Sequence, residues 1–184
     1  MKKQKVAIVT AASKGIGAAC ATQLASEGYK LVLMSRSDSL FALCDQLNAR
    51  PLQGSIEDEN DIARLVGFTY EKYGRIDVVV CNTGHASKGS LLSLTDSEWE
   101  KGMNLLLMNV IRLAKSIGPI MAKQKGGAFV NVSTFGAKEP SLSFPISSVI
   151  RAAVSSYCKL FASELGHVNV RMNNILPGFI NSYP

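Results

Sequence analysis

The sequence predicts a three-layer α/β domain in which helices cover both faces of a doubly wound parallel sheet. Short runs rich in β-branched residues alternate along the chain with longer segments of helical periodicity. The apolar runs are continuous rather than alternating, which is typical of strands buried on both faces of a parallel sheet. A chain of 184 residues is long enough for a substantial core, and without a linker or repeat we expect one domain over residues 1–184.

The elements follow one another in βα order. The predicted strands are Val6–Thr10, Leu31–Met34, Ile76–Cys81, Ala128–Val132 and Asn169–Leu176, with Pro51–Gln53 as a weaker one. The predicted helices are Ile16–Gly28, Asp38–Asn48, Glu57–Tyr73, Asp96–Lys123 and Pro145–Leu165. Ser55 with Asp58 predicts a cap for the third helix, and Thr95 with Glu98 a better one for the fourth. Strands joined by crossover helices imply a parallel sheet.

Composition excludes several classes of protein. Hydrophobic residues make up 47% of the chain and charged residues 18%, as in ordinary globular domains. The net charge of +6 is scattered, with no nucleic-acid-binding motif, and suits an anionic phosphate ligand equally well. No segment has the uninterrupted apolar length of a membrane span, and the apolar run near the N-terminus is too short for a signal peptide. We therefore expect a cytoplasmic protein that binds neither nucleic acid nor membranes.

Cysteine and histidine give no sign of a metal site. The four cysteines, Cys20, Cys44, Cys81 and Cys158, form no C-x-x-C pair, and the chain has only two histidines. We expect no metal, and cysteines that are reduced and mostly buried.

The loop after the first strand has the pattern of a phosphate-binding turn. Residues 10–17 read TAASKGIG and join a predicted strand to a predicted helix. Small residues let a pyrophosphate approach the backbone, and the N-terminus of the following helix supplies N–H groups and a positive dipole. The candidate ligands are Thr10, Ser13, Lys14, Gly15, Ile16 and Gly17; the alternative is a turn that merely needs glycines.

The end of the second strand bears on the choice of cofactor. Ser35-Arg36 stands where an NAD site usually has an acidic residue for the ribose hydroxyls. Arg36, with Lys14 nearby, suits a 2′-phosphate, so we predict NADP(H), with NAD(H) less favoured. The alternative is that both cations are ordinary surface charges. Asn82-Thr83-Gly84, after the strand that ends at Cys81, would lie on the same ligand-binding edge.

Taken together these motifs resemble the short-chain dehydrogenase/reductase family, in its 3-oxoacyl-[acyl-carrier-protein] reductase-like branch. TAASKGIG is similar to the family's T-G-x-x-x-G-I-G, CNTG to N-N-A-G, VNVST to the strand with the catalytic serine, and NVRMNNILPGFINS to I-R-V-N-x-x-x-P-G-x-I-x-T. The resemblance implies a Rossmann fold, a nicotinamide cofactor, a small-molecule substrate and a homo-oligomer, either dimer or tetramer. It also assigns further cofactor contacts to Ser55, Ile56, Pro177, Gly178, Ile180 and Ser182. Because family members continue past this motif, we expect the domain to be incomplete at its C-terminus, with an edge of the sheet and the substrate lid missing.

The chain differs from the family's motifs at the first glycine of the phosphate loop and at the four catalytic positions. Ala11 replaces the first loop glycine, and Leu106, Thr134, Ser147 and Arg151 stand at the asparagine, serine, tyrosine and lysine positions. A serine hydroxyl is far less acidic than a phenol, and a guanidinium does not deprotonate in proteins. Thr134 could hold a substrate carbonyl, and Arg151 could hold ribose hydroxyls or an anionic substrate. Ser147 and Arg151 share a helix face, which could also be plain surface.

These departures leave three hypotheses. The favoured one is an NADP(H)-dependent oxidoreductase for a carbonyl or alcohol, with Thr134, Ser147 and Arg151 as the catalytic set and another group, such as His85, or water moving the proton. The second is a catalytically silent NAD(P)-binding regulatory or partner protein. The third is a lyase-like reuse of the fold, as in halohydrin dehalogenases, which resemble this chain in having arginine at the lysine position. Ser147 and the retained Gly15-Ile16-Gly17 oppose the third.

Overall fold

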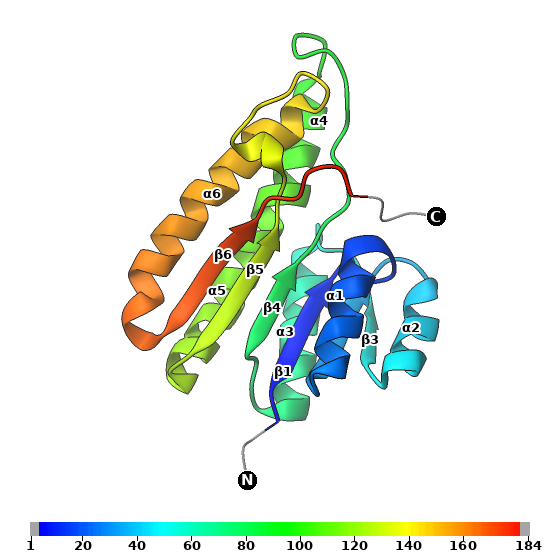
Figure 1. The fold of residues 1–184 in the computed structure, drawn as a ribbon, viewed down its shortest axis with the longest axis vertical. Coiled ribbons are helices and arrows are strands. Elements are labelled where there is room, and N and C mark those ends of the chain that lie inside the picture. Colours follow the sequence, from blue (N-terminus) through cyan, green and yellow to red (C-terminus); the bar gives the residue numbers. More distant parts are fainter. Residues whose placement is uncertain (1–3, 181–184) are drawn as a thin grey trace.

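The computed structural model describes residues 4–180, which form a parallel sheet flanked by helices (Figure 1). Its six strands are ordered β3-β2-β1-β4-β5-β6. The strands are β1 (Val6–Thr10), β2 (Lys30–Ser35), β3 (Arg50–Gln53), β4 (Val78–Cys81), β5 (Gly127–Val132) and β6 (Val170–Ile175). Every neighbouring pair is parallel, which confirms the predicted doubly wound sheet.

Helices pack on both faces of this sheet. They are α1 (Gly15–Ser26), α2 (Ser39–Leu47), α3 (Glu59–Tyr73), α4 (Asp96–Met103), α5 (Asn109–Gln124) and α6 (Pro145–Leu165). One core cluster joins the sheet to α1 and α2, and a larger one joins it to α3, α5 and α6. The continuous apolar strands belong to both clusters: Ile8 packs on one side and Val9 on the other, both fully buried. On the face that carries α1, no helix of the described residues covers β6, where Arg171, Asn173 and Ile175 are exposed.

The long central helix differs from its prediction. Instead of one regular helix it consists of α4, a π-helical turn η1 (Asn104–Met108) and α5. By length and composition alone, the stretch Asp96–Gln124 could cross a membrane, so the expectation that no segment comes near this length was too strict. Its buried residues, among them Leu113 and Ile117, instead pack in the core beneath the sheet.

The caps confirm one prediction and correct another. Thr95 and Glu98 form the predicted capping box at α4, each bonding the other's backbone N–H. At α3 the cap is Asp58, whose carboxylate accepts from the N–H groups of Asn60 and Asp61. Ser55 lies too early; its hydroxyl accepts from the N–H of Glu57 in the preceding turn. A carboxylate directly before the first helical residue can reach two free N–H groups, which Ser55 cannot.

The four cysteines are free, as expected, and three are buried, with Cys20 partly exposed. Burial raises the pKa of Cys44 to about 11, with the nearby Asp45 charge adding to it. Burial also raises the pKa of Cys81 and of Cys158. Thiols that resist deprotonation in this way are structural rather than reactive.

Candidate functional site

A cleft of about 680 Å³ opens at the carboxyl ends of the strands, where β1 and β4 lie side by side. At this point the chain order of the strands reverses, and the loops after the two strands diverge to leave a crevice. Most predicted site residues line this cleft: Ser13, Lys14, Ile16, Ser35, Arg36, Ile56, Asn82, Thr83, Gly84, Thr134, Ser147, Arg151, Pro177, Gly178 and Ile180. The volume suits a bound cofactor or ligand of moderate size.

Four predicted cofactor contacts do not line the cleft, and one prediction lies outside the described residues. Thr10 is buried, and its hydroxyl donates to the carbonyl of Asn82, which ties β1 to β4. Gly15, Gly17 and Ser55 lie behind the lining residues. Ser182 lies in the segment 181–184, outside the described residues, as does Tyr183.

The loop after β1 is as tight as a phosphate-binding turn requires. A Cβ on Gly17 would lie 2.5 Å from the carbonyl oxygen of Ala11 and 2.7 Å from Nδ2 of Asn82, so only glycine fits there. The Asn82 amide donates to that same Ala11 carbonyl and fixes the loop against β4. Ala11 has φ of 46°, a left-handed conformation that glycine adopts more readily, and glycine is the residue of the family motif to which TAASKGIG is similar. No acidic side chain occupies the first turn of α1, so no carboxylate of that turn competes for the N–H groups at the start of this helix, where Ile16 lines the cleft.

The end of the cleft beside the loop after β1 carries the two predicted cations. Lys14 and Arg36 both line it. Ser35 is buried and donates a hydrogen bond to the Ser13 hydroxyl, which joins the end of β2 to the phosphate loop. Arg36 is 73% exposed and lies 3.6 Å from a carboxylate oxygen of Glu57. Such an exposed ion pair is weak, so the guanidinium is free to turn toward a phosphate.

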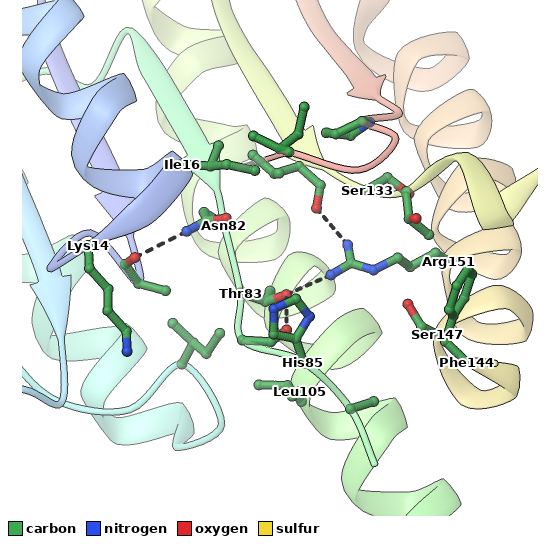
Figure 2. Close-up of a pocket in the computed structure, with 18 of the residues that line it drawn as sticks. Lys14, Ile16, Asn82, Thr83, His85, Leu105, Ser133, Phe144, Ser147 and Arg151 are labelled. Carbon is green, nitrogen blue, oxygen red and sulfur yellow. Dashed lines mark hydrogen bonds between the residues drawn. The ribbon is translucent and has the colours of Figure 1, made fainter. Parts of the chain in front are cut away.

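Arg151 lies at the other end of the cleft, away from Lys14 (Figure 2). Its Nη1 donates to the carbonyl of Val132 at 2.6 Å, and its Nη2 donates to the Thr83 hydroxyl at 2.8 Å. The guanidinium therefore links the ends of β4 and β5. The residue is 9% exposed, and burial lowers the pKa of Arg151 to about 10. The alternative that Ser147 and Arg151 form a plain helix surface is wrong for Arg151.

Hydroxyl groups surround this guanidinium. Thr134 and Ser147 line the cleft, together with Ser133, which the sequence analysis passed over as the neighbour of Thr134. Ser133 is 7% exposed, and its hydroxyl has no hydrogen-bond partner among the described residues. A buried hydroxyl without a partner at the edge of a cavity is positioned to bond a ligand.

An aromatic wall is a second feature that the sequence analysis missed. The ring of Phe135 lies 5.7 Å from that of Phe144 and 5.8 Å from that of Phe179, measured between centroids. All three line the cleft beside the hydroxyl groups. They come from separate loops, so no local pattern in the sequence could bring them together. This end of the cleft thus combines aromatic rings with hydroxyl groups.

Leu106 does not face the cleft. It is 1% exposed and packs with Ile146 and Ile150 of α6. Asn104, two positions earlier in η1, donates instead to the carbonyl of Glu57, and Asn109 donates to the carbonyl of Leu105. Neither amide therefore lines the cleft, and Leu106, at the position where the resemblance implies an asparagine, is part of the core.

His85 does line the cleft, on the exposed loop after β4 (Figure 2). It follows Thr83 by two residues, and Thr83 is the partner of Arg151. The imidazole therefore lies at the same end of the cleft as Arg151. Tyr157 points elsewhere: it packs against the core and the ring of Phe161.

Comparison with known proteins agrees with this geometry. The family model described as short chain dehydrogenase matches residues 5–183. A 3-oxoacyl-[acyl-carrier-protein] reductase from Synechocystis sp. is 31% identical over 183 residues, which cover 96% of this chain and 74% of that protein. Dehydrogenase/reductase SDR family member 4 from Caenorhabditis elegans is 31% identical over 186 residues, covering 97% of this chain and 72% of that protein.

Solved structures give the same result. L-sorbose reductase from Gluconobacter frateurii, complexed with NADPH and L-sorbose, superposes with a TM-score of 0.90 at 30% identity and covers 98% of this chain and 71% of its own. A short-chain dehydrogenase from Streptomyces avermitilis superposes with a TM-score of 0.94 at 25% identity, and the match covers 99% of this chain and 68% of that protein. With the sheet order, the phosphate loop and the cleft in place, the chain belongs to the short-chain dehydrogenase family, as a nicotinamide-dependent oxidoreductase of the 3-oxoacyl-[acyl-carrier-protein] reductase-like branch.

Proposed function

We propose that this protein is an NADP(H)-dependent oxidoreductase that interconverts a carbonyl compound and an alcohol, with Thr134, Ser147 and Arg151 in place of the family's catalytic residues. The main support for this proposal is the composition of one cleft. Its first end has the phosphate loop with Lys14 and Arg36, and its second end has the buried Arg151 with the hydroxyl-bearing residues Ser133, Thr134 and Ser147. We place the adenosine phosphates at the first end and the reacting carbonyl at the second.

The chain's own groups divide the work of reduction. A nicotinamide cofactor, when bound, supplies the hydride for the carbonyl carbon. Thr134 and Ser147 donate hydrogen bonds to the carbonyl oxygen, which gains negative charge as the hydride arrives. The oxygen then needs a proton, which neither a serine hydroxyl nor a guanidinium supplies readily at neutral pH. We assign that proton to His85, because imidazole exchanges protons near neutrality and this ring lies at the substrate end.

Cofactor preference is tested by titrating the protein with NADPH and NADH and following nicotinamide fluorescence. We expect NADPH to bind at least about tenfold more tightly, since a hydrogen bond to a charged group contributes roughly 1.5–3 kcal/mol. Arg36→Ala should remove most of this difference and leave NADH binding unchanged. Arg50→Ala is the matched control, because Arg50 is the first residue of β3 and lies at the amino end of that strand, whereas the cleft opens at the carboxyl ends. Equal affinity for the two cofactors would refute the NADP(H) assignment, and binding of neither would refute the proposal.

The proton donor is tested by His85→Gln in a screen of carbonyl substrates with NADPH. We expect kcat to fall by about 10²-fold with cofactor affinity unchanged, the usual contribution of a general acid. His167→Gln is the control, since His167 lies in the short helix before β6. An unchanged kcat in His85→Gln would mean that water, not His85, donates the proton. If the unaltered protein binds NADPH but turns over no substrate, the alternative of a catalytically silent nucleotide-binding protein is correct.

A further inference from the structure

Arg151 is a buried cation without a counter-charge. Among residues 4–180 its partners are two neutral oxygen atoms, the Val132 carbonyl and the Thr83 hydroxyl, and no carboxylate lies within ion-pair distance. The ion pairs between described residues are Arg36–Glu57, Arg64–Asp61 and Arg75–Asp77, and none of them includes Arg151. A buried charge is costly unless an opposite charge and hydrogen bonds compensate for it. The free protein therefore bears a cost that an anion in the cleft would remove.

The guanidinium also has donors to spare. Arginine carries five N–H groups, and the contacts with Val132 and Thr83 use two of them. The residue lines the cleft, so its side chain forms part of the cavity wall. Guanidinium donors form a planar fork that matches the two oxygens of a carboxylate.

Ser133 supplies an independent indication. Its hydroxyl is buried and has no partner among the described residues, and the residue itself lines the same cavity. It directly follows Val132, whose carbonyl binds Arg151, so the hydroxyl and the guanidinium belong to one small region. A neutral ribose hydroxyl could bond either group but would leave the charge of Arg151 uncompensated. A carboxylate would satisfy the charge and the hydroxyl together.

We propose that the substrate is an oxo acid whose carboxylate is bound by Arg151 and Ser133 and whose carbonyl oxygen faces Thr134 and Ser147. This inference rests on the proposed function and names its substrate class. Ser147 lies one helical turn before Arg151, a spacing of about 5–6 Å between Cβ atoms, and Thr134 follows Ser133. The simplest compounds that carry both groups are 2-oxo and 3-oxo acids, in which the carbonyl is one or two carbons from the carboxylate, and these are the acids to test.

The first test is binding to the NADPH-loaded protein, measured by calorimetry with two unreactive probes, oxamate and malonate. We expect at least one of these anions to bind at least about tenfold more tightly than its neutral counterpart, oxamide or malonamide. In a substrate assay, 2-oxobutanoate or acetoacetate should be reduced faster than its methyl ester. Equal binding of anions and amides would overturn the inference and leave the proposed function standing, because NADPH binding is measured separately.

Variants locate the anion. Arg151→Gln should weaken binding of the preferred anion by at least about tenfold while NADPH affinity changes less than about threefold. Ser133→Ala breaks no hydrogen bond of the described protein, so it should fold normally and still lose about threefold or more in anion affinity. Arg171→Gln, on the exposed face of β6, is the charge-matched control and should change neither. If Arg151→Gln and Ser133→Ala weaken NADPH binding and leave the anion unaffected, these groups serve the cofactor ribose and the inference is wrong.

Discussion

Gly17 is the residue at which packing and ligand binding are hardest to separate. Its missing side chain allows the first turn of α1 to lie against the Ala11 carbonyl and the Asn82 amide. Neither neighbour can retreat easily, because each is held by the hydrogen bond between them. The shape of the phosphate loop therefore depends on a residue that does not itself line the cleft.

Gly17→Ala should distort this loop. A Cβ at 2.5 Å from a backbone oxygen forces the chain to shift, and overpacking of this kind costs about 1–3 kcal/mol of the free energy of unfolding. We expect a loss of at least about tenfold in NADPH affinity, measured by fluorescence titration. Gly67→Ala in α3 is the control, because a Cβ there meets nothing within 4 Å. Equal affinity in the two variants would show that the loop tolerates the extra atom.

The site was predictable at the scale of single motifs but not of contacts between them. The family resemblance assigned Thr134, Ser147 and Arg151 to the site, and all three line the cleft, carried by one strand end and one helix. The contact of Arg151 with Thr83 spans 68 positions of the chain, and although the motif Asn82-Thr83-Gly84 was recognised, nothing in it indicates Arg151 as a partner. Ser133 was missed for a related reason: only the cavity reveals that its hydroxyl is without a partner.

Among the elements, α6 and α3 show how far local rules extend. The range predicted for α6, Pro145–Leu165, is confirmed, because proline favours the first helical position and the apolar pattern continues for the whole length. At α3 two side chains could serve as the cap, and the sequence analysis chose Ser55 where the structure has Asp58. The π turn at η1 was not predicted, since an extra residue in a helical turn needs no particular composition.

Asp58→Ala should expose how much this cap contributes. The carboxylate accepts from two backbone N–H groups, at 2.7 and 3.3 Å, and interacts with the positive end of the helix. Loss of such a cap costs about 1 kcal/mol, measured as the free energy of unfolding in urea. Asp45→Ala, on the exposed side of α2, removes a similar charge without a cap and should have little effect. A cost of the same size in both variants would attribute the effect to charge alone.

For the molecule as a whole, the parallel sheet is fastened at its amino end by Asp77. Its carboxylate accepts two hydrogen bonds from Arg75 and one from the N–H of Val6 at the start of β1. Burial acts to raise the pKa of Asp77, but the hydrogen bonds from Arg75 and Val6 and the charges of Arg75 and Lys5 outweigh it and hold the pKa below its usual value of 3.8. The ionised carboxylate is therefore the form that the fold prefers.

The free energy of unfolding should consequently decrease as Asp77 becomes protonated at low pH. A depressed pKa contributes stability that is fully present above the unfolded value and is lost as the pH falls through the folded one. Asp77→Asn should cost about 2–4 kcal/mol at pH 7, because it leaves a partly buried Arg75 without its partner. Measured by urea unfolding, the difference from the parent should shrink below about pH 4. Glu71→Gln, on the exposed side of α3, should follow the parent at each pH; a constant gap for Asp77→Asn would contradict the linkage.

The bridge that Arg151 forms between two strand ends also limits how this protein could evolve. A lysine at 151 would offer a single nitrogen, on a shorter side chain, to two acceptors that the guanidinium reaches with two nitrogens. A tyrosine at 147 alone would gain no lysine beside it, and an asparagine at 106 would be buried among isoleucines. None of these three single substitutions therefore restores the family's motif by itself, and the changes at 151 and 106 would each disturb contacts that the present residue makes. We expect the three positions to depend on one another, so that their combined effect differs from the sum of the single ones.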